Sequence, residues 1–363
     1  MRAENREARC ARGAPRAGLA CAVLLAGLLG SAAATAGTAY VPLGAAGRIA
    51  VIDTGRDVLA GTIDGIGNVH ALAVTPDGRY LVAGSIEEHA GTVPPRPAGM
   101  SQSEHEAHHR GGGGGTSGAA MSSHVSVIGV RARRELRRVT VPGMVHHIAL
   151  LPDGAHAVAV HTTRGAISVV SVAHGHLVRT VLTGPAPNYA VVSRDGRRVY
   201  VSNTGNDTVS EVDTERWVVL RNFLVGKAPE HLALSPDGGR LYVLEVGDGR
   251  VAELDTASGR VLRRFAVGRA PHGVAVTADG RTLLATAKGG DRLVAVDLAT
   301  GGRREIALAP APYHLALVDG EKVYVTSRKA PVVWVLDART LKVRGEIRLP
   351  EGEGHQIAVH PGG

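Results

Sequence analysis

The sequence predicts an all-β protein: a closed, seven-bladed β-propeller with four antiparallel strands in each blade. Three observations lead to this prediction. A short apolar phrase with an Asp-Gly turn recurs along the 363 residues, its copies are spaced by about the length of one blade, and the two ends of the chain together supply the blade that the internal copies leave incomplete.

The recurring phrase has the form apolar-Ala-apolar, then Thr/Ser-Pro-Asp-Gly or a variant, then an apolar strand. Apolar stretches joined by Asp-Gly turns are typical of antiparallel β-structure. The marker aspartates are Asp77, Asp153, Asp195, Asp237, Asp279 and Asp319, in steps of 76, 42, 42, 42 and 40 residues. A period near 42 with four strands per unit is typical of propellers, and the longer first step indicates a 34-residue insertion.

Each unit continues with a third strand that ends in an aspartate, followed by a fourth strand. The third strands that end at Asp213-Thr214 and Asp255-Thr256 are examples. Because they recur once per blade, we interpret these aspartates as turn caps and not as catalytic groups. They are Asp53, Asp213, Asp255, Asp297 and Asp337.

The two ends of the chain are predicted to close the ring. The segments TAYVPLG and RIAVIDT, near the start, match the second and third strands of a blade, whereas HQIAVHP at the end matches only a first strand. The last strand is therefore expected to complete the first blade, which removes free sheet edges.

Residues 1–36 have the order of a secretory signal peptide. Five arginines and two glutamates make a basic start, an apolar run covers residues 17–30, and small residues end at Ala36. We expect export by the general secretory route to the periplasm or medium, and a mature, monomeric propeller over residues 37–363. No later stretch is apolar enough to cross a membrane.

Removal of residues 1–36 also removes both cysteines, Cys10 and Cys21, and lowers the formal charge from +8 to +5. The mature chain then has no thiolate for metal binding or catalysis. No basic run with interleaved aromatics is present, so nucleic acid is not an expected partner.

The residue pattern resembles the YVTN (YncE-like) propeller family over the whole mature chain. The phrases that carry the resemblance are VYVSN from Val199, VYVTS from Val323, and PHGVAV from Pro271. The resemblance implies the propeller architecture, whereas one fold hosts many activities and does not choose among them.

The residue before each first strand is predicted to lie at one mouth of the channel, and in several blades this residue is a histidine. In blade order that position holds His70, His146, Asn188, Glu230, His272, Tyr313 and His355; the next position adds His147, His231 and His314. The second strands return to this mouth and end at Ser85, His161, Asn203, Glu245, Ala287 and Ser327. Imidazoles from neighbouring blades could share an ion, and imidazole suits Zn, Cu, Fe or Ni. A polar residue at a wet mouth is the simpler structural interpretation of each one.

The insertion, residues 86–123, adds a second group of histidines. His105 and His109 would share a helix face with His108 beside them, and the five glycines 111–115 indicate a flexible segment. The alternative to a metal-binding segment is a low-complexity spacer in which the histidines have no role. The expected metal ligands are His105, His108, His109, His70, His146, His147, His161, His272 and His355, with a second rank of His89, His124, His231, His314, Glu230, Glu245, Asn188 and Asn203.

These features are similar to those of periplasmic propeller metallochaperones (AztD-like) that deliver zinc beside ABC transporters. The resemblance implies a non-enzymatic protein that binds zinc, with copper or calcium as alternatives, and passes it to a solute-binding protein. A second hypothesis is a lactonase-like hydrolase that holds Ca²⁺ with Glu230, Glu245, Asn188 and Asn203. A third is a scaffold that binds a protein or an envelope polymer. No Gly-x-Ser-x-Gly elbow or Cys-x-x-Cys-His haem site is present.

Overall fold

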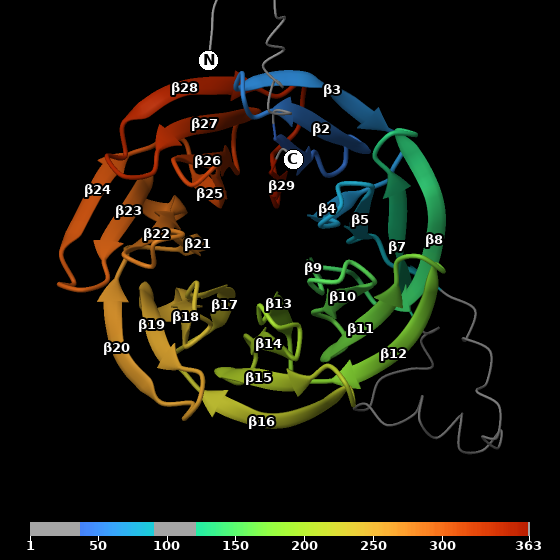
Figure 1. Ribbon diagram of the computed structural model, residues 1–363, viewed down its shortest axis with the longest axis horizontal. Helices are drawn as coiled ribbons and strands as arrows, with labels where there is room; N and C mark the ends of the chain where they lie inside the picture. The colour runs from blue at the N-terminus through green and yellow to red at the C-terminus, as the bar shows by residue number, and fades with distance from the viewer. Residues whose placement is uncertain (1–36, 91–120, 362–363) are drawn as a thin grey trace, which may run out of the picture. The chain divides into compact units, whose positions relative to one another are not determined.

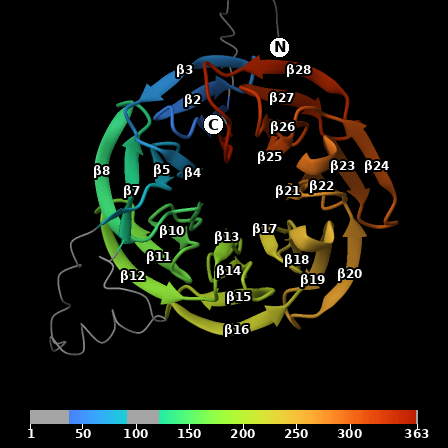
Figure 2. The same ribbon diagram turned by 180° about the vertical axis from the view of Figure 1, so that it is seen from behind.

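A computed structural model describes residues 37–90 and 121–361, which belong to one compact unit, Thr35–Gly363. Seven antiparallel sheets surround a central channel (Figure 1; Figure 2 shows the other face). Each has the four strands of a blade, and the sheet of β4, β5, β7 and β8 has the short β6 as a fifth. The predicted seven-bladed propeller is confirmed.

The strands of each blade follow one another outward from the channel in chain order, except that β29, the last strand of the chain, is the innermost strand of the first blade. The innermost strands are β4 (Val69–Val74), β9 (His147–Leu150), β13 (Pro187–Val192), β17 (Pro229–Leu234), β21 (Pro271–Val276), β25 (Pro312–Val318) and β29 (Ala358–His360). The second strands are β1 (Thr38–Pro42), β5 (Tyr80–Ser85), β10 (His156–His161), β14 (Arg198–Asn203), β18 (Arg240–Glu245), β22 (Thr282–Ala287) and β26 (Lys322–Ser327).

The third and fourth strands complete the blades. The third strands are β2 (Arg48–Asp53), β7 (Met121–Gly129), β11 (Ala166–Ser171), β15 (Thr208–Asp213), β19 (Arg250–Asp255), β23 (Arg292–Asp297) and β27 (Val332–Asp337). The outer strands are β3 (Val58–Asp64), β8 (Arg134–Pro142), β12 (His176–Leu182), β16 (Val218–Leu224), β20 (Val261–Ala266), β24 (Arg303–Ala307) and β28 (Val343–Arg348). Two short 3₁₀ turns, η1 (Val246–Asp248) and η2 (Lys288–Gly290), follow β18 and β22.

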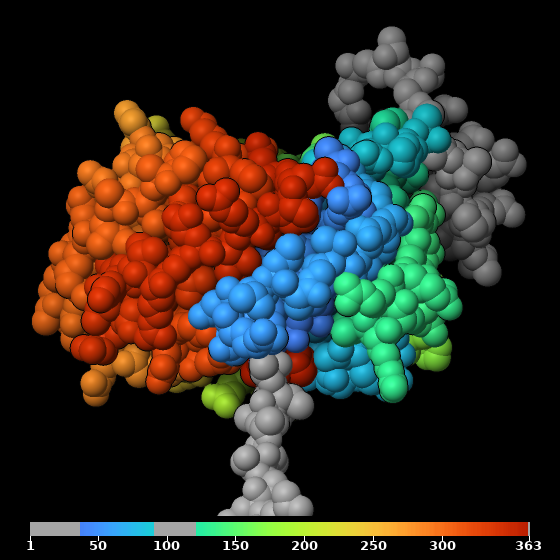
Figure 3. Space-filling model, turned by 90° about the horizontal axis from the view of Figure 1, so that it is seen from above, coloured from blue at the N-terminus to red at the C-terminus, as the bar shows by residue number. Residues whose placement is uncertain are grey.

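The last strand closes the ring as expected. β29 pairs with β1 in antiparallel register, with Thr38 opposite His360 and Tyr40 opposite Ala358. The first and last blades also pack side by side (Figure 3), where Ala39, Val41 and Val333 share one buried apolar cluster. Without β29, β1 would be an open sheet edge.

The recurring aspartates are turn residues. Asp77 Oδ1 accepts hydrogen bonds from Thr75 Oγ1 at 2.6 Å and from the Arg79 amide at 3.0 Å, and the same pattern recurs at Asp195 and Asp279. Asp213 Oδ1, after a third strand, accepts the amides of the next turn at 2.9 and 3.1 Å. These bonds explain why the sequence repeats Asp at each turn.

The expected insertion, 86–123, falls between β5, which ends at Ser85, and β7, which begins at Met121. A two-residue strand, β6 (His89–Ala90), pairs with the start of β7, and His89 lies opposite Ser122. Residues 91–120, with His105, His108 and His109, lie outside the described residues, as do residues 1–36 of the expected signal peptide. Within residues 37–90 and 121–361, no helix is long and apolar enough to span a membrane.

Candidate functional site

Two successive positions on the inner strands fill the channel with side chains. The burial of most of them corrects the expectation of a wet mouth: His147 and His231 are 3% exposed, His272 is 4% exposed, and His314 and His355 are 7% exposed, whereas His70 and His146 are half-buried. The seven inner strands bring these rings against one another, so the rings exclude water from the channel wall.

The rings form a nearly continuous belt around the channel. His147 stacks on Tyr189 at 3.5 Å between ring centroids, and Tyr189 stacks on His231 at 4.2 Å. The belt continues through His231–His272 at 4.3 Å, His272–Tyr313 at 3.8 Å, Tyr313–His355 at 6.0 Å, His355–His70 at 4.3 Å and His70–His146 at 5.0 Å.

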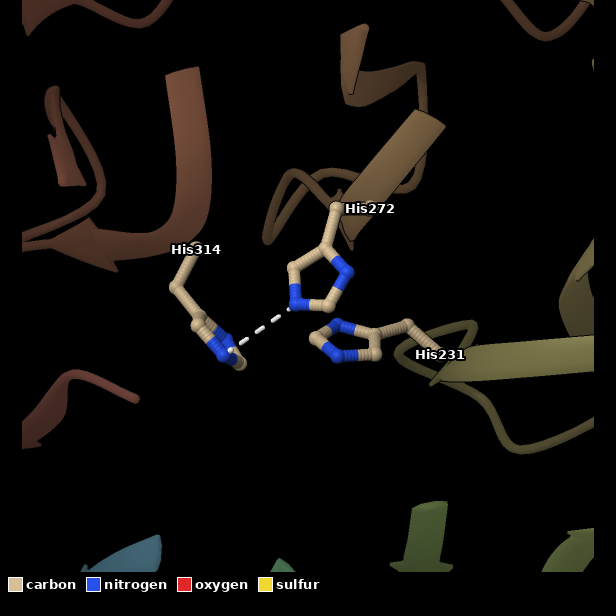
Figure 4. A group of neighbouring side chains, drawn as sticks. All are labelled: His231, His272 and His314. Atoms are coloured by element: carbon tan, nitrogen blue, oxygen red, sulfur yellow. Dashed lines mark hydrogen bonds between the residues drawn. The ribbon is translucent and has the colours of Figure 1, made fainter. Parts of the chain in front are cut away.

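Three histidines of this belt present their ring nitrogens to one point. His231, His272 and His314 come from β17, β21 and β25 and each offers a nitrogen within 4.8 Å of the others (Figure 4). His272 Nε2 lies 3.4 Å from His314 Nε2. Two nitrogens bound to zinc at 2.0–2.1 Å in tetrahedral geometry are about 3.3 Å apart. We call these three residues the histidine triad; they could hold a metal ion.

Gly273 permits this arrangement. It occupies the strand position at which the two neighbouring blades have His231 and His314. A Cβ atom at Gly273 would lie 2.8 Å from the Tyr313 carbonyl oxygen and 3.1 Å from the Leu315 amide nitrogen. The glycine therefore lets β21 approach β25 closely, which brings His272 against His314.

We expect Gly273→Ala to destabilise the protein by about 1–3 kcal/mol, because β21 and β25 must move apart. The same movement separates His272 from His314 and should weaken zinc binding. Urea unfolding and zinc titration measure the two effects. Gly345→Ala, on the outer strand β28 with no atom within 4 Å of the new Cβ, is the matched control and should stay within about 0.5 kcal/mol. Equal behaviour of the two variants would contradict this role for Gly273.

Burial keeps the triad neutral. It lowers the pKa of His231, His272 and His314 well below the ordinary value, and neighbouring histidines and the Lys288 ammonium lower the pKa of His231 and His272 further. Neutral imidazole is the form that binds a metal ion, so the triad is held in its ligand form without competition from protons.

Glu230 is the carboxylate nearest to the triad. Its Oε2 lies 3.4 Å from His272 Nδ1, a buried nitrogen without an aligned hydrogen-bond partner in the described part of the chain. Burial raises the pKa of Glu230, whereas the nearby Lys288 lowers it. A carboxylate beside Nδ1 favours the tautomer with the proton on that atom, which leaves the Nε2 lone pair for a metal.

The other expected histidines lie outside the triad. His355, His70 and His146 continue the belt beyond Tyr313, and burial lowers the pKa of His70 to about 2 and that of His355 to about 4. His147 Nδ1 accepts the Ala190 amide at 3.2 Å, and its Nε2 lies 3.0 Å from the Gln356 side-chain nitrogen. Outside the belt are His161, whose Nδ1 lies 3.1 Å from the Met144 carbonyl, exposed His89 in β6, and half-buried His124 in β7.

The oxygen ligands expected for a calcium hydrolase do not form one cluster. Glu245 accepts the Gly226 amide at 2.7 Å and Arg264 Nε at 3.0 Å, and Asn203 Nδ2 donates to Thr208 and Ser210. These bonds hold both side chains within their own blades. In the described residues, the triad is the one group of three or more His, Cys, Asp or Glu side chains with metal-ligand spacing.

Residues 123–344 match the family model of the outer membrane protein assembly factor BamB. The chain belongs to the BamB family. No curated protein matches this BamB-family chain.

Solved structures that are similar to the chain share its propeller. They include a protein of unknown function from Desulfotomaculum acetoxidans (15% identity, 89% of this chain and 99% of that one, TM-score 0.67). A candidate 6-phosphogluconolactonase from Bacteroides uniformis has 13% identity, the same coverage and a TM-score of 0.67. Hydrazine synthase from Kuenenia stuttgartiensis has 18% identity over 82% of this chain and 90% of that one, with a TM-score of 0.64. At these identities the likeness establishes the fold alone.

Proposed function

We propose that this protein binds one divalent transition-metal ion, zinc in the first place, in its channel through His231, His272 and His314. The observation that carries the proposal is the convergence of the three ring nitrogens within 4.8 Å of one another. Three protein ligands with a fourth position left for another group is a common zinc arrangement. An all-nitrogen set favours Zn or Cu over Ca²⁺, which prefers oxygen ligands.

The cellular role that we propose is that of an exported, non-enzymatic metal carrier. The signal-like residues 1–36, the His-rich segment with His105, His108 and His109, and the resemblance to the YVTN propellers and to the zinc metallochaperones support this role. In it, the segment captures the ion, the triad holds it, and a solute-binding protein of a metal transporter receives it.

Zinc titration by calorimetry tests the triad. The wild type should bind zinc, and His231→Ala or His314→Ala should each lower the zinc affinity of the triad by at least about 100-fold. Loss of a residue that only hydrogen-bonds to a ligand lowers metal affinity by about 100-fold at most. His156→Ala is the matched control, because His156 lies at the opposite end of β10 from His161. Unchanged affinity in both triad variants would overturn the proposal.

A variant without residues 91–120 distinguishes zinc binding by the triad from zinc binding by the His-rich segment. If the triad holds the ion, this variant retains the tight site and loses only additional zinc equivalents. Loss of the tight site in this variant would assign it to the segment instead. Competition with copper in the same assay decides which of the two metals the triad prefers.

A further inference from the structure

Two cations flank the ring that covers the triad. Tyr313 stacks on His272 with 6° between the ring planes, Lys288 Nζ lies 5.3 Å from the Tyr313 ring centroid, and Arg328 Cζ lies 5.5 Å from it. Lys288 begins η2 directly after β22, and Arg328 follows β26 directly. The turns after two neighbouring second strands therefore bring both cations to the triad side of the channel.

One of the two cations has an ionic partner and the other does not. Arg328 pairs with Glu353, whereas no carboxylate of the described residues lies within 4.0 Å of Lys288.

The belt also holds buried nitrogens that lack partners. Nδ1 of His70 and Nδ1 of His355 have no hydrogen-bond partner within residues 37–90 and 121–361. A neutral imidazole donates one N–H, and a buried donor without an acceptor is costly. The centroid of His355 lies 6.0 Å from that of Tyr313, and the centroid of His70 lies 4.3 Å from that of His355, so the unpartnered nitrogens belong to the part of the belt that adjoins Tyr313 and the Arg328 guanidinium.

A metal ion in the triad would have an unbalanced charge. Three neutral imidazoles contribute no negative charge to a divalent ion, and Lys288 adds a further positive charge beside it, against the single carboxylate of Glu230. Buried charge is stable only when it is paired.

We propose that the fourth coordination position of the bound metal takes a small oxyanion, a carboxylate or a phosphate, which pairs with Lys288 and Arg328. This inference rests on the proposed function, since the triad supplies the metal. The protein would thus carry its ion together with a small anion. Glu353, by pairing with Arg328, competes with that anion.

The protein loaded with Co²⁺ in place of zinc tests this proposal, because the visible absorption of Co²⁺ responds to its fourth ligand. Acetate and inorganic phosphate are titrated in separate arms, and a saturable spectral change is expected for at least one. Lys288→Gln and Arg328→Gln should each weaken binding of that anion by about tenfold or more, whereas Co²⁺ affinity measured without anion should not fall in either variant, because each removes a positive charge near the ion. Glu353→Gln should tighten binding of the anion, because Arg328 then loses its carboxylate partner.

Lys342→Gln, on an exposed outer turn, is the control for loss of one positive charge. A Co²⁺ spectrum that neither anion changes, or an anion affinity that the variants at Lys288 and Arg328 leave as it is, would overturn the inference alone. If Co²⁺ does not bind the triad of the wild type, the proposed function fails and the inference fails with it. A response to acetate but not phosphate identifies a carboxylate ligand, and the reverse identifies a phosphate.

Discussion

The free energy of unfolding is expected to fall by at least about 5 kcal/mol between pH 7 and pH 5, because buried histidines remain neutral in the folded chain and three of them alone account for about that amount. Burial lowers the folded pKa of His70 to about 2 and those of His161 and His355 to about 4, below the value near 6.5 of an unfolded chain. The unfolded chain therefore binds protons first as the pH falls. Stability is complete above about pH 6.5 and is lost as the pH falls from there towards 4, and the loss reaches about 2 kcal/mol for each of these histidines at pH 5.

Such a loss is comparable to the whole stability of an ordinary domain, so acid unfolding should occur near pH 5. Urea unfolding at several pH values measures it. His161→Asn should reduce the slope of stability against pH, since one proton-binding difference is removed, whereas His89→Asn, at an exposed position, should leave the slope unchanged. A stability that is flat between pH 7 and pH 5 would show that the buried histidines accept protons without cost and would contradict the burial argument.

The architecture could be predicted from the sequence because it depends on turn residues that recur in each blade. Each Asp-Gly turn needs an aspartate that accepts the amides beyond it, as Asp77 and Asp195 do, and such residues recur with the blade. The closing strand was predictable for a similar reason: the start of the chain supplies no first strand and the end supplies only that strand. Pairing of β29 with β1 is then the one arrangement that leaves no open edge.

The site was predictable only in part, because it depends on distances between blades. Alignment on the turns identified two belt positions but ranked His272 above His231 and His314, although the three converge. Gly273 could have indicated the convergence. It is the one glycine at the strand position of His231 and His314, and it permits β21 and β25 to approach each other. Lys288 was missed because it lies one residue beyond Ala287, the second-strand end that the alignment compared, in a turn that carries it over Tyr313.

Burial of the triad has a second consequence, for the pH dependence of zinc binding. Between about pH 7.5 and pH 5.5 we expect the affinity of the triad for zinc to change by less than about tenfold. An ordinary three-histidine site, with pKa values near 6.5, loses about 10³-fold in affinity for each pH unit below that value, because three protons must leave. The fold has already lowered the pKa of His231, His272 and His314 well below this range, so few protons compete with the ion.

Zinc titration at several pH values, in the variant without residues 91–120, measures this affinity free of His105, His108 and His109. Circular dichroism at each pH defines the range in which the protein is folded. A decrease near 10³-fold per pH unit while the fold persists would mean that ordinary, accessible histidines hold the ion, and the triad would lose its assignment. A flat profile that ends abruptly at acid unfolding is the expected result, because both effects have one cause. The burial that destabilises the fold in acid is the same burial that keeps the imidazoles deprotonated and ready for a metal ion.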